Sequence, residues 1–445
     1  MKKLLPLVIS AALSGLYTTS AFADTLAEIY SQAKDNDPTL LNAAALRDSA
    51  FEAINSSRSS LLPQINLTAS YDYTDSNYEN ALGNGTMDSN RLNAGVSFSQ
   101  ELYNRSSWIS LDTAEKTARR ADSAYAANQQ ELILRVSQAY FDVLKSKESL
   151  QFVRAEKKAV ARQLEQTKQR FEVGLSAITD VHDAQAQYDT VLADEVLAEN
   201  ELANSYEGLR EITGRSHSNL SELDTKRFSA SRPDETVQRL VDQAQQKNLS
   251  LLTARIEQDI ARDNITLASS GHLPTLTLDG GYSYFQEHNN ENSYHNEDIG
   301  SLNLGLNLSV PLYTGGKVTS LTKQAEYDYV AASQDLEKTY RTVVKDVRGY
   351  NNNIVASIGA IRAYEQTVVS AKSALEATEA GFDVGTRTIV DVLDSTRRLY
   401  DANRSLANAR YDYIISVLQL RQAVGTLSEQ DILDISASLK PVTNS

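Results

Sequence analysis

Two stretches of the chain alternate strictly between apolar and polar residues. One runs from Arg91 to Leu102, and the other runs from Leu302 to Val310. A period of two over ten or so residues predicts a β-strand with one apolar and one polar face. A Leu-Pro pair, Leu62-Pro63 or Leu273-Pro274, begins another strand before each stretch, since proline is tolerated at a strand's first residue. The pattern predicts four strands of about 11 residues. We expect them in hairpins at about 62–103 and 273–313, with solvent-facing loops at about 76–90 and 286–298.

Longer stretches repeat apolar residues every three, four or seven positions. This spacing holds from Val136 to Phe171, from Ile361 to Phe382 and from Ala407 to Leu418. Sustained heptads are typical of coiled coils. No glycine lies between Gly95 and Gly174, so a helix from Asn104 to Val173 would be roughly 105 Å long. Amphipathic helices packed on an ordinary core are the alternative interpretation.

The two halves of the chain carry the same elements in the same order. Phe171-Glu172-Val173-Gly174 recurs as Phe382-Asp383-Val384-Gly385, 211 positions later, and Asp180 recurs as Asp391 at the same spacing. Each half opens with a helix, at about 26–57 and 236–269. We therefore expect an internal duplication. The first structural repeat is 24–228 with long helices at about 104–213, the second is 229–435 with long helices at about 316–425, and 436–445 is a short C-terminal tail.

Residues 1–23 have the pattern of a secretory signal peptide that is removed before Asp24. Lys2 and Lys3 supply the positive start, Leu4 to Leu16 is mostly apolar, and Ala21-Phe22-Ala23 is a small-residue cleavage site. The alternative, an N-terminal membrane anchor, would need an apolar run of about 20 residues.

Composition and charge exclude several classes of function. The formal charge of −15 argues against nucleic acid as a partner. There are no cysteines, and none of the five histidines belongs to a nucleophile, phosphate-loop or metal-ligand motif. We therefore expect no enzyme activity, no catalytic residue, no cofactor and no metal. A cation held near His288 and His295, in an acidic loop, is the alternative to a free solvated loop.

Four amphipathic strands cannot close into a barrel, and an open sheet edge cannot lie in lipid. Other copies of the chain must complete a membrane-spanning sheet. Three copies give 12 strands, an even number within the known range. Two copies give 8, and side chains fill the interior of so small a barrel. The expected fold is all-α plus transmembrane β: a homotrimeric 12-stranded β-barrel, with four strands per chain, continued by a long α-helical coiled-coil barrel. A small soluble sheet is the alternative.

Several long motifs, in register with one another, resemble the TolC family of outer-membrane efflux and secretion channels. The stretches 170–181 and 384–394 look like the two helix-turn-helix tips of that family. Three further motifs also resemble it: Leu61-Leu62-Pro63-Gln64, Gly271-His272-Leu273-Pro274 and Pro311-Leu312-Tyr313-Thr314-Gly315-Gly316. The resemblance covers nearly the whole chain after the signal peptide.

The resemblance implies a homotrimeric exit duct in the cell outer membrane, with its helical domain in the periplasm. Its expected partners are a periplasmic adaptor (membrane fusion) protein, an inner-membrane RND, ABC or MFS transporter, and outer-membrane lipid. The duct would serve tripartite efflux pumps and type I secretion systems, carrying drugs, bile salts and proteins. Inward-coiled helix pairs would close its periplasmic end and open like an iris.

The resemblance also assigns residues to this gate. Thr179 and Asp180 in one tip would meet Arg387 of a neighbouring protomer's other tip. A planar guanidinium suits a latch, because it makes two charge-assisted bonds to a carboxylate. The family's best-known member has Tyr where this chain has Phe382, so a hydrogen bond from that position to Asp180 is missing here. Ordinary surface pairing is the alternative.

Two further groups of residues receive roles at the tips. Asp391 and Asp394, three apart on one helix face, would form a ring of carboxylates at the constriction that selects cations; solvated surface charges are the alternative. Val173, Gly174, Val384 and Gly385 would meet the adaptor, although Gly past a helix end is also a common structural cap. The rival to the whole interpretation is a soluble periplasmic coiled-coil adaptor or structural protein.

Overall fold

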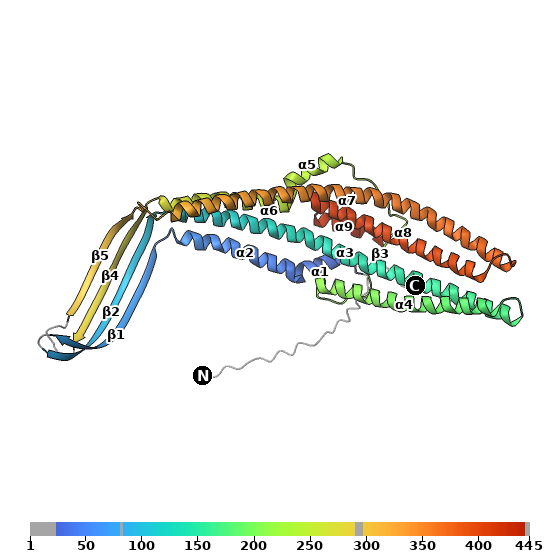
Figure 1. Cartoon of the computed structure of the whole chain (residues 1–445), viewed down its shortest axis with the longest axis horizontal. Helices are drawn as coiled ribbons and strands as arrows, with labels where there is room; N and C mark the ends of the chain where they lie inside the picture. Colours follow the sequence, from blue (N-terminus) through green and yellow to red (C-terminus); the bar gives the residue numbers. More distant parts are fainter. Residues whose placement is uncertain (1–23, 81–82, 290–296, 441–445) are drawn as a thin grey trace, which may run out of the picture.

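The computed structural model describes residues 24–80, 83–289 and 297–440. A sheet lies at one end of an elongated molecule, and two long helical hairpins extend to the other end (Figure 1). The expected signal peptide at 1–23 lies outside the described residues.

The sheet contains four antiparallel strands in the order β1-β2-β4-β5. Their bounds are Gln64–Asn80, Gly83–Tyr103, Thr275–Asn289 and Glu297–Ser309. The expected polar loops at 76–90 and 286–298 are largely wrong, because the strands continue into both ranges; 290–296 lies outside the described residues. The backbone ladder tolerates any side chain that faces water, as where Asp75 lies opposite Asp88. The polar composition of these ranges therefore indicates exposure to water, while the backbone pairing between the strands continues through them.

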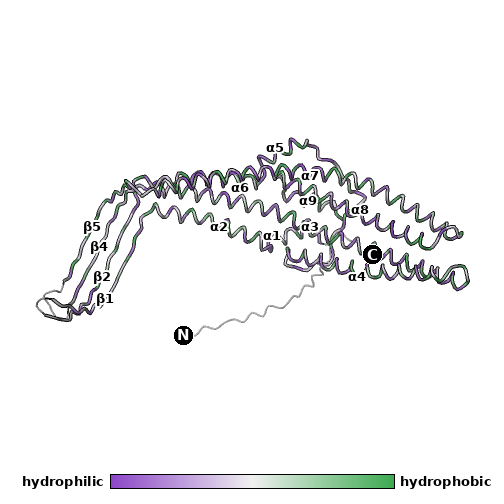
Figure 2. Tube along the Cα trace, viewed as in Figure 1, coloured by the Kyte–Doolittle hydropathy of each residue, from purple (hydrophilic) through white to green (hydrophobic). Residues whose placement is uncertain are grey.

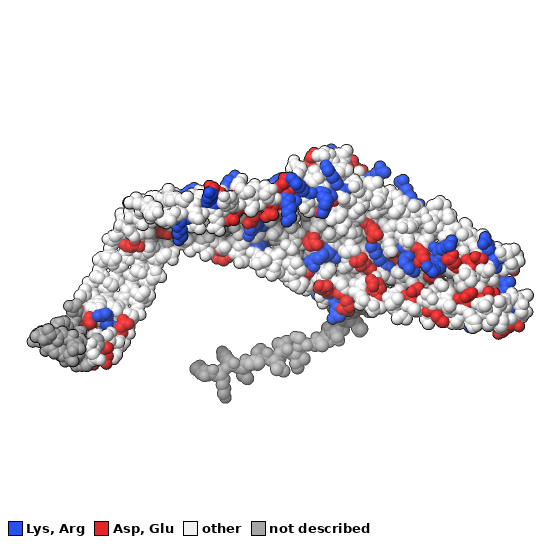
Figure 3. Space-filling model, in the orientation of Figure 1, with Lys and Arg blue, Asp and Glu red and all other residues white. Residues whose placement is uncertain are grey.

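One face of this sheet is apolar and uncovered. The register places Ile65 opposite Phe98, Val96 opposite Tyr282, and Tyr282 opposite Leu302. Leu67 is 78% exposed and Leu302 is 83% exposed. No charged residue occurs at 64–71, 92–100, 280–286 or 299–309. The visible face of the sheet accordingly shows a band without charge, between charges near its far end and charges on the helices (Figure 3).

The helix expected at the start of each repeat is in fact two helices. In the first repeat α1 (Leu26–Asn36) and α2 (Pro38–Ser59) meet at Asp37. Pro38 disfavours helical geometry at the residue before it, and the Asp37 side chain accepts a hydrogen bond from Leu40 N at 2.9 Å. In the second repeat α5 (Val237–Lys247) and α6 (Leu249–Ser269) meet at Asn248, which caps α6 through Leu251 N at 3.0 Å.

Two pairs of long helices form the hairpins. Helix α3 (Arg105–Glu172) has 68 residues, as the breaker-free run predicts, and returns as α4 (Ile178–Thr213). Helix α7 (Lys317–Asp383) has 67 residues and returns as α8 (Ile389–Val424). Apolar and polar residues alternate around each helix (Figure 2). The heptad positions Val136, Tyr140, Val143, Leu150, Val153, Val160 and Leu164 are all buried. None of the helices in the described ranges combines the length and hydropathy that crossing a membrane requires.

The main core lies at mid-length, where both hairpins meet both chain ends. It contains Leu26, Ile29, Tyr140, Phe141 and Leu220, together with apolar residues of α7 and α8. A smaller apolar cluster, here called the lower cluster, lies nearer the tips. Its buried members are Val153, Val160, Leu164, Ala184, Val191, Ile389, Val392 and Leu393.

Part of the expected C-terminal tail is structured. After α9 (Glu429–Ala437), β6 (Leu439–Lys440) pairs antiparallel with β3 (Glu222–Leu223). Two residues carry too little pattern to predict a strand. The short helical turn η1 (Ser270–His272) connects α6 to β4.

Candidate functional site

Both hairpins end in the same kind of turn. At the first tip, Gly174 has φ 75° and Leu175 N donates to Arg170 O at 2.8 Å. At the second tip, Gly385 has φ 81° and Thr386 N donates to Gly381 O at 2.8 Å. Positive φ favours glycine, so each glycine has a structural role. Val173 and Val384, one residue earlier, are both exposed and leave an apolar side chain at each tip.

The aspartates that follow these turns cap α4 and α8. Asp180 Oδ2 accepts from Ala177 N at 3.1 Å and from Ser176 Oγ at 2.6 Å. Asp391 Oδ2 accepts from Thr388 N at 2.9 Å and from Thr388 Oγ1 at 3.0 Å. These hydrogen bonds lower the pKa of the Asp391 carboxyl, and the charge of Arg387 lowers it further. The hydrogen bonds therefore fix the orientation of both carboxylates.

Asp394 is exposed on the same helix face as Asp391. Its Oδ2 lies 2.7 Å from Arg398 Nη2, one turn further along α8. Each of the two expected ring carboxylates thus has a partner within its own helix. Cap and ion pair hold them in place, three residues apart.

Arg387 and Thr179 are exposed. The ion pairs at the tips join Arg170 to Asp383 and Arg398 to Asp394. Among the described residues of one protomer, no ion pair or hydrogen bond joins the Arg387 side chain to Thr179 or Asp180. The structure therefore does not bring the expected latch residues together within one chain, and the Arg387 guanidinium remains accessible to a neighbour.

Phe382 has a partner that sequence reasoning missed. The Arg170 guanidinium lies 4.5 Å from the Phe382 ring centroid and 3.8 Å from Asp383 Oδ1. Phe382 is half-buried and packs against the lower cluster. A cation over an aromatic face is attracted by the ring quadrupole. Arg170 therefore links the first hairpin to the second within one protomer.

The two repeats differ at Arg170, and this difference is the sequence signal for its contact with Phe382. The residue 211 positions after Arg170 is Gly381, and the residue 211 positions after Ser176 is Arg387. A Cβ at Gly381 would lie 2.7 Å from Arg387 Cγ, so the missing side chain makes room for Arg387. Departures from the repeat therefore mark the residues that distinguish the tips.

A buried carboxylate interrupts the packing above the tips. Glu156 on α3 is 5% exposed. Burial raises its pKa to about 7, and the charge of Asp401 adds to the rise, while Arg404 opposes it. Nothing in the heptad pattern singles out this residue, because Glu156 lies between Val153 and Val160, the apolar positions that carry the period.

The chain matches the sequence profile of a family described as "Outer membrane efflux protein", over residues 29–215 and 240–426. The two ranges start 211 residues apart, as the repeats do. The chain is 70% identical to outer membrane protein TolC of Vibrio cholerae serotype O1 over 441 residues, which cover 99% of each chain.

Two more distant similarities extend the comparison. The proteases secretion protein PrtF of Dickeya chrysanthemi is 27% identical, over 100% of this chain and 97% of that protein. The crystal structure of the Campylobacter jejuni CmeC outer membrane channel superimposes with a TM-score of 0.77 at 16% identity, covering 99% of this chain and 98% of that one. At that identity the likeness shows the fold.

Glu156 predicts a pH dependence of stability. With its pKa raised from 4.5 to about 7 in the folded chain, the folded state binds the proton more tightly than the unfolded state. Stability therefore falls as the pH rises between these values, by roughly 2 kcal/mol. Glu156→Gln should remove this fall, measured by thermal unfolding at pH 5 and pH 8. Glu165→Gln, an exposed position on the same helix, is the control. Equal pH dependence in Glu156→Gln and the original chain would contradict the assignment.

Proposed function

The chain belongs to the outer membrane efflux protein family, as an outer-membrane efflux and secretion channel, and from that premise we propose that three copies form one continuous duct. The observation that carries the proposal is the sheet. Its apolar face is uncovered, and its edge strands β1 and β5 have unpaired outer sides. Lipid offers no partner for these backbone groups, so another chain must supply one.

The strand directions suit such a ring. All neighbours within the sheet are antiparallel, so β1 and β5 run in opposite directions. When β5 of one copy meets β1 of the next, the alternation continues across the seam. Three copies of a four-stranded sheet make 12 strands, an even number within the range of outer-membrane barrels. The apolar face meets lipid, and the face with Asn66, Ser97 and Asn303 lines the lumen.

The helices near the sheet support the same closure. Their packing order is α2-α3-α6-α7, so α2 and α7 are the edges of this layer. Both edges expose apolar side chains: Leu41, Leu46 and Phe51 on α2, and Leu321, Tyr327 and Val330 on α7. Joining α7 of one copy to α2 of the next covers both sets. The same neighbour that closes the barrel thus closes the helical wall.

Each part of the chain has a place in this assembly. Residues 1–23 are removed on export, and the repeats 24–228 and 229–435 each contribute one strand hairpin and one helical hairpin. Residues 436–445 are the C-terminal end, which begins within α9. The barrel spans the outer membrane, and the helical tunnel extends into the periplasm.

The tips meet the other components of the export system. Val173, Gly174, Val384 and Gly385 dock a periplasmic adaptor, and an inner-membrane RND, ABC or MFS transporter delivers the cargo. Export of proteins is supported by the relative PrtF, which is named for protease secretion; drugs and bile salts are the cargo expected for efflux. The exposed valines give the adaptor an apolar contact at each tip.

The gate uses two arginines, one for a contact within the protomer and one for a contact between protomers. Within a protomer, Arg170 holds Phe382 and Asp383. Between protomers, Arg387 reaches Thr179 and Asp180 of the neighbouring first tip. Exposed ion pairs contribute only about 0–1 kcal/mol each, so a docking partner can separate them. This reversibility is what a gate requires.

Deletion and complementation test the function. Cells without the protein should become sensitive to drugs and bile salts and should stop secreting protein cargo, because the exit duct is missing. Reintroduction should restore export, and the protein should be extracted from membranes by detergent as a heat-resistant trimer. A water-soluble monomer would contradict the channel and favour the periplasmic adaptor.

Substitution of the latch arginine tests the gate. Arg387→Ala should raise the resting conductance of single channels in a planar bilayer, roughly tenfold, because three weak pairs are lost together. Arg341→Ala, which removes an exposed arginine of α7 paired with Glu337 one turn away, is the control. Unchanged conductance in Arg387→Ala would exclude the latch.

Substitution of the ring carboxylates tests the constriction. Asp391→Asn with Asp394→Asn should abolish block of the channel by a trivalent cation, because six negative charges are removed from the trimer. Asparagine keeps an oxygen that accepts the Thr388 hydrogen bonds, so the cap of α8 is retained. Asp401→Asn, further along α8, is the control. Persistent block in the double variant would refute the ring.

A further inference from the structure

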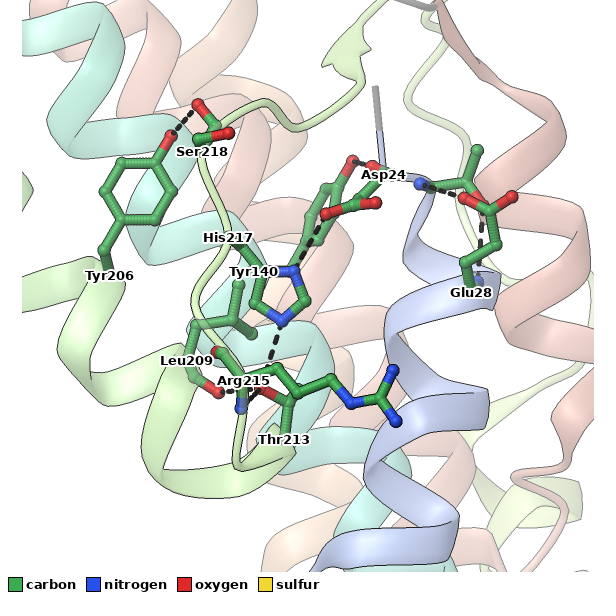
Figure 4. Close-up of polar contacts among 10 residues, drawn as sticks. Asp24, Glu28, Tyr140, Tyr206, Leu209, Thr213, Arg215, His217 and Ser218 are labelled. Atoms are coloured by element: carbon green, nitrogen blue, oxygen red, sulfur yellow. Dashed lines mark hydrogen bonds and ion pairs between the residues drawn. The ribbon is translucent and has the colours of Figure 1, made fainter. Parts of the chain in front are cut away.

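The segment that connects the two repeats holds the first described residue of the chain. Asp24 N donates to Asn219 O at 2.8 Å, and Ser221 N donates to Asp24 O at 3.1 Å. Asp24 and Leu220 form a parallel β-bridge. The Asp24 carboxylate lies 2.9 Å from His217 Nδ1 (Figure 4). The backbone and the side chain of Asp24 are thus both held.

His217 is fixed for this contact. Its side chain is 2% exposed, and its Nε2 lies 3.0 Å from Thr213 Oγ1. The hydroxyl proton of Thr213 has carbonyl acceptors at Leu209 and Arg215, at 3.1 and 3.2 Å. The two ring nitrogens therefore face Thr213 on one side and the Asp24 carboxylate on the other. The order threonine, histidine, aspartate resembles a hydrolase triad, but Thr213 is fully buried, so no substrate can reach its hydroxyl.

Tyr140 also contacts the backbone around Asp24. Its hydroxyl donates to Ser221 O at 2.7 Å. The same hydroxyl lies 3.4 Å from Asp24 O (Figure 4). Burial raises the pKa of the Tyr140 phenol, so the hydroxyl keeps its proton. A fully buried tyrosine of the main core therefore contacts the backbone of Asp24 and of the segment that holds it.

The position suits a chain end. A new terminus at Asp24 carries an α-ammonium, which has three protons to donate where an amide has one. Asn219 O already accepts one of them, and Glu28, whose carboxylate accepts from Thr25 N at 2.9 Å, supplies negative charge one residue away. A cation is otherwise disfavoured at a helix N-terminus, and Asp24 immediately precedes the N-cap of α1. The carboxylates of Asp24 and Glu28 offset that cost.

We propose that residues 213–223, with Tyr140, form a binding site for the processed N-terminus, which recognises the ammonium and carboxylate groups of Asp24. The proposal rests on the removal of residues 1–23 described under the proposed function. The same segment pairs Glu222 and Leu223 with β6 near the other end of the chain. Both ends of the fold are thereby fastened to one segment, and α1 completes the core after cleavage.

A double-mutant cycle on the purified full-length trimer tests the site. The variants are Asp24→Asn, His217→Gln and the pair, with His272→Gln as the exposed control. Intact mass establishes that each chain begins at residue 24. The readouts are the rate at which an amine-reactive reagent labels the α-amine, and hydrogen exchange of the α1 amides at Ile29 and Ala33. Each single variant should raise both rates roughly tenfold, which corresponds to the loss of one hydrogen bond to a charged group.

The cycle separates recognition from general destabilisation. The double variant should be no faster than the faster single variant, because either change breaks the same contact. Three results would overturn the proposal. The rates in His217→Gln could equal those in His272→Gln, the effects of Asp24→Asn and His217→Gln could add in the double variant, or the chain could begin at a residue other than Asp24. Export by the wild-type protein is measured in parallel. Its absence would count against the proposed channel function, whereas the labelling rates would still test the binding site for the N-terminus.

Discussion

The unpaired backbone groups along β1 and β5 are the constraint on which the rest of the structure depends. In lipid, each unsatisfied N–H or C=O costs several kcal/mol, and two whole strands present such groups. No arrangement of one chain removes that cost, whereas a ring of copies removes all of it. In the proposed ring, closure would fix which sheet face meets lipid, and it would bring the helices into one wall, since α2 and α7 continue from the edge strands. The proposed assembly would therefore be held by a large free energy, whereas the exposed ion pairs of the proposed gate would contribute little.

The duplication explains both the likeness of the two hairpins and the importance of their differences. Gly174 and Gly385 make the same turn, and Asp180 and Asp391 cap the helices that follow. Two identical tips would place like charges opposite each other around a ring. The exchange of Ser176 for Arg387 at equivalent positions supplies the complementary charge, and the exchange of Arg170 for Gly381 makes space for it. The tips thus keep a common backbone and differ in the side chains that the proposed latch would use.

Much of the fold was predictable from the sequence because its signals are periodic and long. The alternation at 91–102 predicted a strand with one apolar face. The heptads predicted the buried positions of α3 from Val136 to Leu164, whereas Phe171, the last position of the run, is 42% exposed. The features that the sequence did not predict depend on single residues or on partners distant in sequence. The break at Asp37 requires one proline and one cap, and β6 requires pairing with a strand over 200 positions earlier. The contact of Arg170 with Phe382 joins different repeats, so only the departure from the 211-residue spacing could have indicated it.

The distribution of core packing decides where the hairpins can bend. Helices of 67 and 68 residues act as stiff rods, so their tips move apart only by pivoting at a higher level. The main core holds α3 and α8 together down to about Leu144 and Leu406, and both chain ends reinforce it near Leu220. Below it the lower cluster is small, and Glu156 replaces an apolar contact with a carboxylate whose charge burial disfavours. The smaller cluster with its buried carboxylate lies between the main core and the exposed ion pairs of the tips, so the proposed gate would pivot just below the core.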